Sequence, residues 1–270
     1  DLRIDYSILE QHSESYRKIR NTFRFILGNI QDSFQKVDLK DLNLKELPEL
    51  ERYILHKIYV LNLNYKENLK NYNFHKLYKE LLNFCTLDLS SFYFDIRKDV
   101  LYCDNVNSKK RKNCILVLNI LLDCLLKWFA PILVFTTEEI YNLVEKSDTS
   151  IHEKEFPELK SDFHDNKLAE KWQNLFKIKQ EANIAIEEKR SNKEIGSSLE
   201  AEIVIYTNET NYKLLEKLDL TEYFITSKAK LEKNSKSDET VIEVKKMKGE
   251  KCPRCWKILE KKCSRCAEFL

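Results

Sequence analysis

Two Cys-x-x-Cys pairs near the end of the sequence constrain this 270-residue chain more than any other feature. They read Cys252-Pro-Arg-Cys255 and Cys263-Ser-Arg-Cys266, with seven residues between them. A Cys-x-x-Cys turn points both sulfurs at one spot, so the two turns supply four thiolates for a tetrahedral Zn²⁺ with Zn–S distances of about 2.3 Å. The short interval allows only a hairpin or tight loop, which predicts one small closed knuckle. Because four protein ligands leave no open position, we expect the zinc ion to be structural.

Cysteine pairs have other uses, namely redox dithiols, disulfides and iron binding. A redox Cys-x-x-Cys usually occurs once, at the start of a helix in a βαβ unit, and that setting is absent here. The spacing therefore favours zinc over these alternatives. The other four cysteines are scattered among apolar residues, which is typical of reduced core thiols and indicates a reducing cytoplasm. These are Cys85, Cys103, Cys114 and Cys124.

The knuckle is strongly basic. Residues 245–266 hold nine Lys or Arg against two Glu, a balance of +7, and a zinc ion with four thiolates lowers it to about +5. Some of these cations can neutralise the thiolates, but the excess favours a polyanion, because each neutralised phosphate releases counterions. Trp256 follows the first cysteine pair directly. Its ring can pack over the zinc site or offer a face to an unstacked base.

Composition indicates a long-helix protein with an ordinary core. Hydrophobic residues make up 43% and charged residues 33%, with a net charge of only +2. Any nucleic-acid affinity must therefore come from local patches. Three glycines and four prolines are too few for a sheet-rich fold built on tight turns. No apolar run reaches about 18 residues, so we expect no membrane span.

Apolar residues at helical spacing predict an antiparallel α-helical bundle over residues 1–145. The first helix is expected at 7–33, and its opposite face carries Arg17, Arg20 and Arg24. That face is a candidate phosphate track, or else a solvated face with i, i+4 ion pairs. The expected apolar stripe of this helix is Ile8, His12, Tyr16, Ile19, Phe23, Ile26 and Ile30. Further helices are expected at 49–71, from 73, at 91–102, at 108–130 and up to 144.

The composition changes after a polar linker at 146–165. A helix is expected at 167–190, a strand at 202–207, a short helix at 212–218 and strands at 223–227 and 240–244. These elements predict a small α/β module over 166–248, and the zinc knuckle at 249–270 closes the chain. The fold predicted is thus mainly α.

The sequence shows no active site. Three glycines cannot build a Gly-rich phosphate loop, and no nucleophile–His–acid set has recognisable spacing. Asp95, Asp99 and Asp104 lie near one another, and paired carboxylates can do acid–base chemistry. Arg97 and Lys98 lie beside them, however, which favours helix salt bridges. We therefore predict no catalytic residue and interpret the chain as a binding module.

Several stretches together resemble bacterial isoleucyl-tRNA synthetase, a class I aminoacyl-tRNA synthetase. The stretches at 16–29, 95–102 and 128–139 resemble its anticodon-binding domain, and 195–202 resembles the start of its small α/β module. The two cysteine pairs resemble its C-terminal zinc peptide. The interval between the pairs and the tail after Cys266 are shorter than the family pattern, which puts in doubt any contact made by a longer loop.

The resemblance implies an enzyme that activates isoleucine with ATP and transfers it to its tRNA. The catalytic and editing domains would lie upstream, so ATP would bind outside this sequence. The chain would bind the anticodon arm of tRNA(Ile), in a cytoplasmic and monomeric enzyme with no membrane contact. In this interpretation the three arginines of the first helix contact phosphates, and Arg254, Trp256 and Arg265 meet the anticodon loop. One alternative is a structural or protein-interaction segment stabilised by zinc. Another is an enzyme that works alone, and the missing phosphate loop argues against it.

Overall fold

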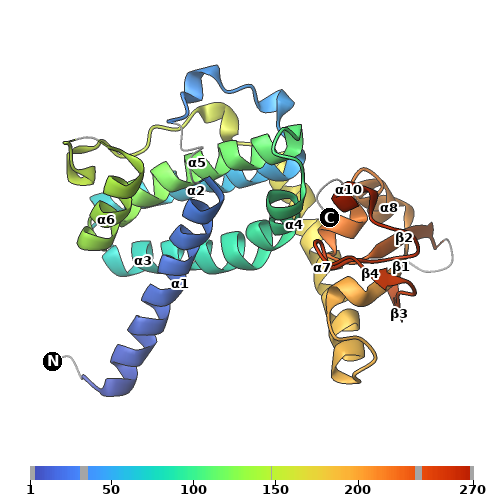
Figure 1. Cartoon of the computed structure of the whole chain (residues 1–270). Coiled ribbons are helices and arrows are strands. Elements are labelled where there is room, and N and C mark those ends of the chain that lie inside the picture. The colour runs from blue at the N-terminus through green and yellow to red at the C-terminus, as the bar shows by residue number, and fades with distance from the viewer. Residues whose placement is uncertain (1–3, 31–35, 147, 235–238, 268–270) are drawn as a thin grey trace. The chain divides into compact units, whose positions relative to one another are not determined.

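The chain forms two compact units in a computed structural model that describes residues 4–30, 36–146, 148–234 and 239–267 (Figure 1). Unit 1 comprises residues 1–95 and 106–165, and unit 2 comprises residues 96–105 and 166–270. Residues 96–105 lie early in the sequence, but they belong to the same unit as the C-terminal part of the chain. The four-part division expected from composition stays a prediction.

Unit 1 is an α-helical bundle, as the apolar periodicity predicts. Its long helices are α1 (Tyr6–Ile30), α2 (Glu49–Lys70), α3 (Phe74–Asn83), α5 (Lys109–Phe129) and α6 (Val134–Val144). A π-helical segment, Phe84–Phe94, follows α3 directly and leads into α4 (Asp95–Cys103). Short 3₁₀ turns occupy Leu39–Asp41, Leu44–Glu46, Ile151–Glu153 and Ser161–Phe163.

Helix α5 is the centre of this bundle and packs against α1, α2 and α6. The Ser108 side chain caps it by accepting a hydrogen bond from the Arg111 N–H, and Pro131 follows its last turn. Its apolar residues are buried on most of its circumference, including Trp128 at 0% exposure. The Tyr65 hydroxyl of α2 donates to the Trp128 carbonyl oxygen at 3.0 Å. The bundle core thus lies where the sequence is most apolar.

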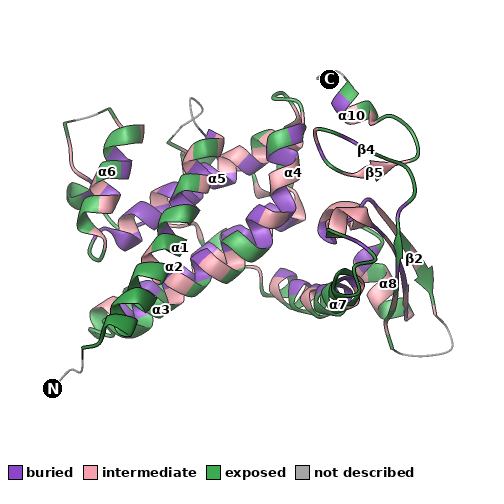
Figure 2. Ribbon diagram, turned by 60° about the horizontal axis from the view of Figure 1, so that its bottom comes forward, coloured by how far each residue is buried: buried purple, intermediate pink, exposed green. Residues whose placement is uncertain are grey.

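Helix α1 departs from the expected apolar stripe in its first half. Ile19, Phe23, Ile26 and Ile30 are buried, but Ile8 and His12 are exposed. Figure 2 shows the start of α1 in green, the colour of exposed residues. The helical period was right, but residues 4–14 are exposed in the part of the chain that the structure describes. The predicted burial of His12 was therefore wrong.

Unit 2 combines a three-stranded sheet, covering helices and the cysteine knuckle. Its elements are α4, α7 (Asn166–Ser191), β1 (Ala201–Thr207), α8 (Glu209–Leu215), α9 (Leu220–Tyr223), β2 (Lys228–Lys233), β3 (Val241–Lys246), β4 (Glu250–Lys251), β5 (Ile258–Leu259) and α10 (Ser264–Ala267). The sheet order is β2-β1-β3, with β1 parallel to β2 and antiparallel to β3. The central strand β1 is buried almost throughout. Helix α7 packs on β3, and α8 and α9 pack on β2.

The strand expected at 223–227 lies instead at Lys228–Lys233. The Asp219 side chain caps α9 by accepting from the Glu222 N–H, and Ile225 turns the chain with a φ of 56°. Glu202 of β1 then pairs with Lys228. Pairing with a buried neighbour therefore outweighs the strand propensity of the apolar residues just before it.

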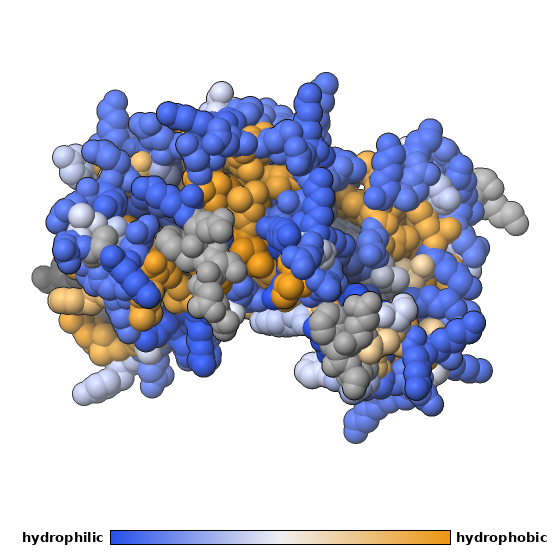
Figure 3. Space-filling view, turned by 45° about the horizontal axis from the view of Figure 1, so that its top comes forward, coloured by the Kyte–Doolittle hydropathy of each residue, from blue (hydrophilic) through white to orange (hydrophobic). Residues whose placement is uncertain are grey.

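Figure 3 shows hydrophilic side chains over most of one face, with patches of apolar surface between them. Among the described residues, no helix is both long and apolar enough to cross a membrane.

Candidate functional site

The knuckle is built from a two-stranded hairpin and one short helix. Strands β4 and β5 pair antiparallel, and between them the Cys252 N–H donates to the Lys257 carbonyl oxygen at 2.9 Å. The Trp256 N–H donates to the Cys252 carbonyl oxygen, also at 2.9 Å, which closes the first Cys-x-x-Cys turn. The second pair lies at α10, where the Cys266 N–H donates to the Cys263 carbonyl oxygen at 3.2 Å. Both turns are thus held by their own backbones.

Gly249 fixes the approach of the chain to this hairpin. It has a φ of 136°, and a Cβ at this position would lie 2.2 Å from the Leu259 carbonyl oxygen. Only glycine combines that backbone conformation with so close a contact.

The four cysteine sulfurs meet at one point. Each lies within 4.8 Å of the others, and the Sγ atoms of Cys255 and Cys263 are 3.9 Å apart. A tetrahedral ion with metal–sulfur bonds of about 2.3 Å needs sulfurs about 3.8 Å apart. Cys252, Cys255 and Cys266 are buried. The donor set and its spacing therefore fit a four-coordinate metal ion.

The electrostatics of the cluster also favour a cation. Burial, and then the neighbouring Cys263 thiol, raises the pKa of Cys266 to about 12. Burial also raises the pKa of Cys255. Burial acts in the same direction on Cys252, but hydrogen bonds from the backbone N–H groups of Cys255 and Arg254 lower its pKa to about 7. A bound cation supplies the charge that lets four crowded thiols ionise together.

Trp256 presents its ring to solvent. The residue is 61% exposed and has a positive φ of 64°. The Lys251 ammonium lies 5.6 Å from the ring centroid, a cation–π contact. The ring therefore leaves a face open to solvent, and its use by a base stays a prediction.

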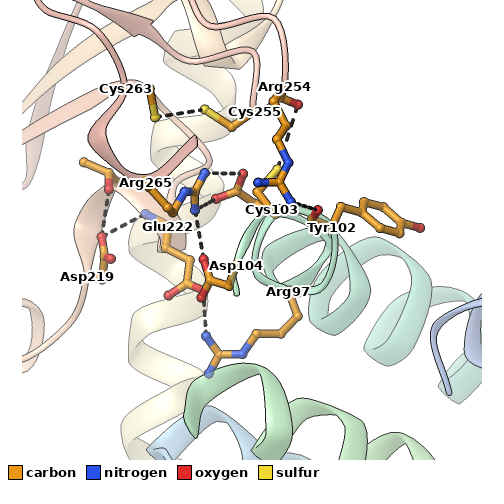
Figure 4. Close-up of polar contacts among 12 residues, drawn as sticks. Arg97, Tyr102, Cys103, Asp104, Asp219, Glu222, Arg254, Cys255, Cys263 and Arg265 are labelled. Carbon is orange, nitrogen blue, oxygen red and sulfur yellow. Dashed lines mark hydrogen bonds and ion pairs between the residues drawn. The ribbon is translucent and has the colours of Figure 1, made fainter. Parts of the chain in front are cut away.

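Arg254 and Arg265, predicted to meet RNA, both contact α4 (Figure 4). Nη2 of Arg254 lies 3.2 Å from the Tyr102 carbonyl oxygen. The Arg265 guanidinium donates to both carboxylate oxygens of Asp99, at 2.6 and 2.9 Å. It also lies 3.4 Å from a carboxylate oxygen of Asp104. Asp99 and Asp104 thus form ion pairs with Arg265, far along the chain, whereas the sequence favoured salt bridges with the neighbouring Arg97 and Lys98.

The three predicted arginines of α1 lie together on its exposed face. Arg17 pairs with Glu14 at 2.6 Å. Arg20 donates to the Tyr16 hydroxyl at 3.1 Å and lies 3.7 Å from Glu139. Arg24 is exposed. These arginines belong to unit 1 and the knuckle to unit 2, so each group is a separate candidate surface.

Comparison with known proteins decides the family. Residues 51–205 match the family model described as the anticodon-binding domain of tRNA ligase. The chain belongs to this family. It is 58% identical to the isoleucine–tRNA ligase of Pelagibacter ubique over 98% of the chain and 29% of that protein.

Other isoleucine–tRNA ligases are also similar over nearly the whole chain. The protein of Natranaerobius thermophilus is 36% identical over 100% of the chain and 31% of its own length. The protein of Thermotoga maritima is 38% identical over 95% of the chain and 29% of its own length. The chain thus spans about three tenths of the curated relatives it matches, and these similarities confirm the family resemblance seen in the sequence.

Sequence reasoning missed the residues of α4 that meet the knuckle. Cys103 was taken as an ordinary core thiol, yet it is buried in one cluster with Cys252, Cys255 and Cys266. The sequence held one signal of a shared role for the two turns. Arginine occupies the third position of both Cys-x-x-Cys turns.

Proposed function

We propose that the chain binds the anticodon arm of tRNA(Ile) as part of an isoleucine–tRNA ligase. The match of residues 51–205 to the anticodon-binding family carries this proposal, and the similar isoleucine–tRNA ligases give the amino acid. The whole enzyme would attach isoleucine to its tRNA using ATP, with catalysis and editing in parts of the protein outside this chain. We further propose a monomeric, cytoplasmic enzyme.

Two exposed surfaces would contact the RNA. The cations of α1 (Arg17, Arg20 and Arg24) would neutralise phosphates, which gives affinity without sequence selection. Trp256 would stack on an unpaired base of the anticodon loop, a contact worth about 1–3 kcal/mol. Arg254 and Arg265 of the same knuckle would meet the anticodon loop beside it, while part of each guanidinium contacts α4.

Zn²⁺ is the ion that we propose for the four cysteines. Its preference for four thiolates in a closed tetrahedral site matches the observed sulfur spacing. Metal analysis of the purified chain should give one zinc per chain, and Cys263→Ser should reduce that content. A metal-free chain, or iron in place of zinc, would contradict the assignment.

A filter-binding titration tests the function. The zinc-loaded chain is titrated with tRNA(Ile) and with the same tRNA carrying a swapped anticodon, at low and moderate salt. Preference for the cognate anticodon, with affinity falling as salt rises, is the expected result. Equal weak binding to both tRNAs would contradict anticodon recognition.

A structural role of the knuckle is the second candidate. It is favoured by the contacts of Arg254 and Arg265 with α4, which tie the knuckle to its own chain. If this is the whole role, Trp256 substitution will leave tRNA affinity unchanged while zinc removal destabilises unit 2.

A further inference from the structure

The two Cys-x-x-Cys turns carry arginine at equivalent positions, and both arginines reach the same helix end. Arg254 precedes Cys255, and Arg265 precedes Cys266. Arg254 contacts Tyr102, and Arg265 contacts Asp99 and Asp104. All of these residues belong to unit 2. Two arginine contacts therefore join the metal-binding turns to the end of a helix that lies more than 140 residues away in the sequence.

Arg254 caps the C-terminus of α4. The last carbonyl groups of a helix have no partner within the helix, and this end carries a partial negative charge. The Asp104 N–H closes the last turn on the Val100 carbonyl oxygen at 3.1 Å. The Tyr102 carbonyl oxygen instead accepts a hydrogen bond from Nη2 of Arg254. The contact is reciprocal, because the Cys103 Sγ lies 3.8 Å from the Arg254 carbonyl oxygen.

Arg265 joins the metal ligands to the same turn. Its two hydrogen bonds to Asp99 have the parallel geometry typical of strong arginine–carboxylate pairs. The Cys255 thiol also interacts electrostatically with this guanidinium. Arg265 directly precedes the metal ligand Cys266, so one planar group joins the second cysteine turn to a carboxylate of α4. This is the position of an outer-shell residue that orients a metal ligand.

The earlier part of α4 has an anchor of its own. Arg97 donates to Glu222 of α9 at 2.7 Å, and both side chains are nearly buried, with 4% and 10% exposure. This pair does not involve the knuckle (Figure 4). Loss of the knuckle contacts would therefore loosen residues 99–104, while Arg97 still holds the helix to the α/β elements.

We propose that metal binding sets the conformation of residues 99–104, with Arg254 and Arg265 as the positioning residues. A small metal knuckle folds only around its ion, so removal of the ion separates the two turns. The guanidinium groups then lose their fixed spacing, and the end of α4 loses its cap and its ion pair. This inference rests on the proposed metal site and requires no RNA.

Hydrogen exchange of the metal-loaded chain, measured without RNA, tests the inference. We expect the amides of residues 99–104, Asp104 in particular, to exchange at least about tenfold faster after zinc is removed with a chelator, because charge-assisted hydrogen bonds to the turn are lost. Arg265→Ala should accelerate the same amides with one zinc still bound. Arg265→Lys, which keeps the charge and loses the paired donors, should give an intermediate rate. Lys261→Ala changes an exposed cation of the same knuckle and should have no effect.

A substitution on the helix side separates this role from misfolding of the knuckle. Asp99→Asn leaves the knuckle sequence intact and should also accelerate exchange at residues 99–104, with zinc content unchanged. Wild-type protection in both Arg265→Ala and Asp99→Asn, each with one zinc, would overturn the proposal. Unchanged exchange after chelation would do the same. Because no RNA is present, failure here is distinct from failure to bind tRNA.

Discussion

The indole N–H of Trp128 donates a hydrogen bond of 3.1 Å to the side-chain oxygen of Asn62, inside the bundle of unit 1. Asn62 is 4% exposed and Trp128 is fully buried. The amide nitrogen of Asn62 also donates to the Pro157 carbonyl oxygen at 3.0 Å. One side chain therefore satisfies buried polar groups of α5 and of the segment that follows α6.

Replacing Asn62 should destabilise unit 1. Asn62→Ala leaves the indole N–H and the Pro157 carbonyl oxygen buried without this partner, so the free energy of unfolding should fall by about 2–3 kcal/mol. Urea unfolding followed by far-UV circular dichroism measures the change. Asn64→Ala, two residues away and exposed, is the matched control and should change it by less than about 0.5 kcal/mol. Equal effects of the two substitutions would contradict this account of Asn62.

His56 should make unit 1 sensitive to mild acid. Its Nδ1 accepts a hydrogen bond from the Asp165 N–H at 2.9 Å, and the ring of His164 stacks on it at 5.4 Å. Burial, and then His164, lowers the pKa of His56 below its ordinary value of 6.5. As the pH falls through 6.5, His56 of the unfolded chain takes up a proton while the folded form stays neutral. Its contribution to stability is present above 6.5 and is lost as the pH falls toward the lower pKa of the folded chain.

Chemical unfolding between pH 8 and pH 5 checks this dependence. Wild type should lose stability over the interval below pH 6.5, with a slope from this one group of at most about 1.4 kcal/mol per pH unit. His56→Gln should remove that part of the slope. His12→Gln, at an exposed position of α1, should keep the wild-type profile. Parallel profiles for wild type and His56→Gln would contradict the prediction.

The helices of the bundle were predictable because their signals are local. The apolar period and Pro48 place a helix at 49–71, and the structure has Glu49–Lys70. Ser108 marks the start of α5, and its side chain does cap it. The four cysteines also cluster as their spacing predicts. Each of these features depends on residues within a few turns of one another.

The features that sequence reasoning missed depend on distant partners. Arg265 and Asp99 are separated by 166 positions, and no local pattern shows that they meet. Strand β2 carries four charged residues with only Ala229 and Leu231 between them, and its pairing with β1 makes it a strand. The exposure of Ile8 depends on how far the neighbouring helices extend. The periodicity of α1 carries no information about those helices.

Arg24 should contribute to the salt dependence of tRNA binding. On a helix of about 100° per residue, it shares a face with Arg17 and Arg20, away from the buried residues of α1. If it neutralises one phosphate, Arg24→Gln should lower the slope of log affinity against log salt by about 0.7–0.9. Lys18→Gln removes the same charge from another side of α1 and should leave the slope unchanged. The measurement is filter binding of tRNA(Ile) at four salt concentrations, and an equal slope in the two variants would refute the phosphate track.

Trp256 should contribute to tRNA affinity through stacking rather than through the fold. Trp256→Asn removes the ring but keeps a residue that tolerates the left-handed backbone at this position, where φ is 64°. Loss of one stacked base should weaken binding of tRNA(Ile) by about 5- to 150-fold, which corresponds to 1–3 kcal/mol, with zinc content and unfolding unchanged. Tyr72→Asn is the matched control, since Tyr72 is also an exposed aromatic residue with a positive φ, 57°. It lies in unit 1 and should leave affinity intact. Wild-type affinity in zinc-loaded Trp256→Asn would show that no base stacks on this ring.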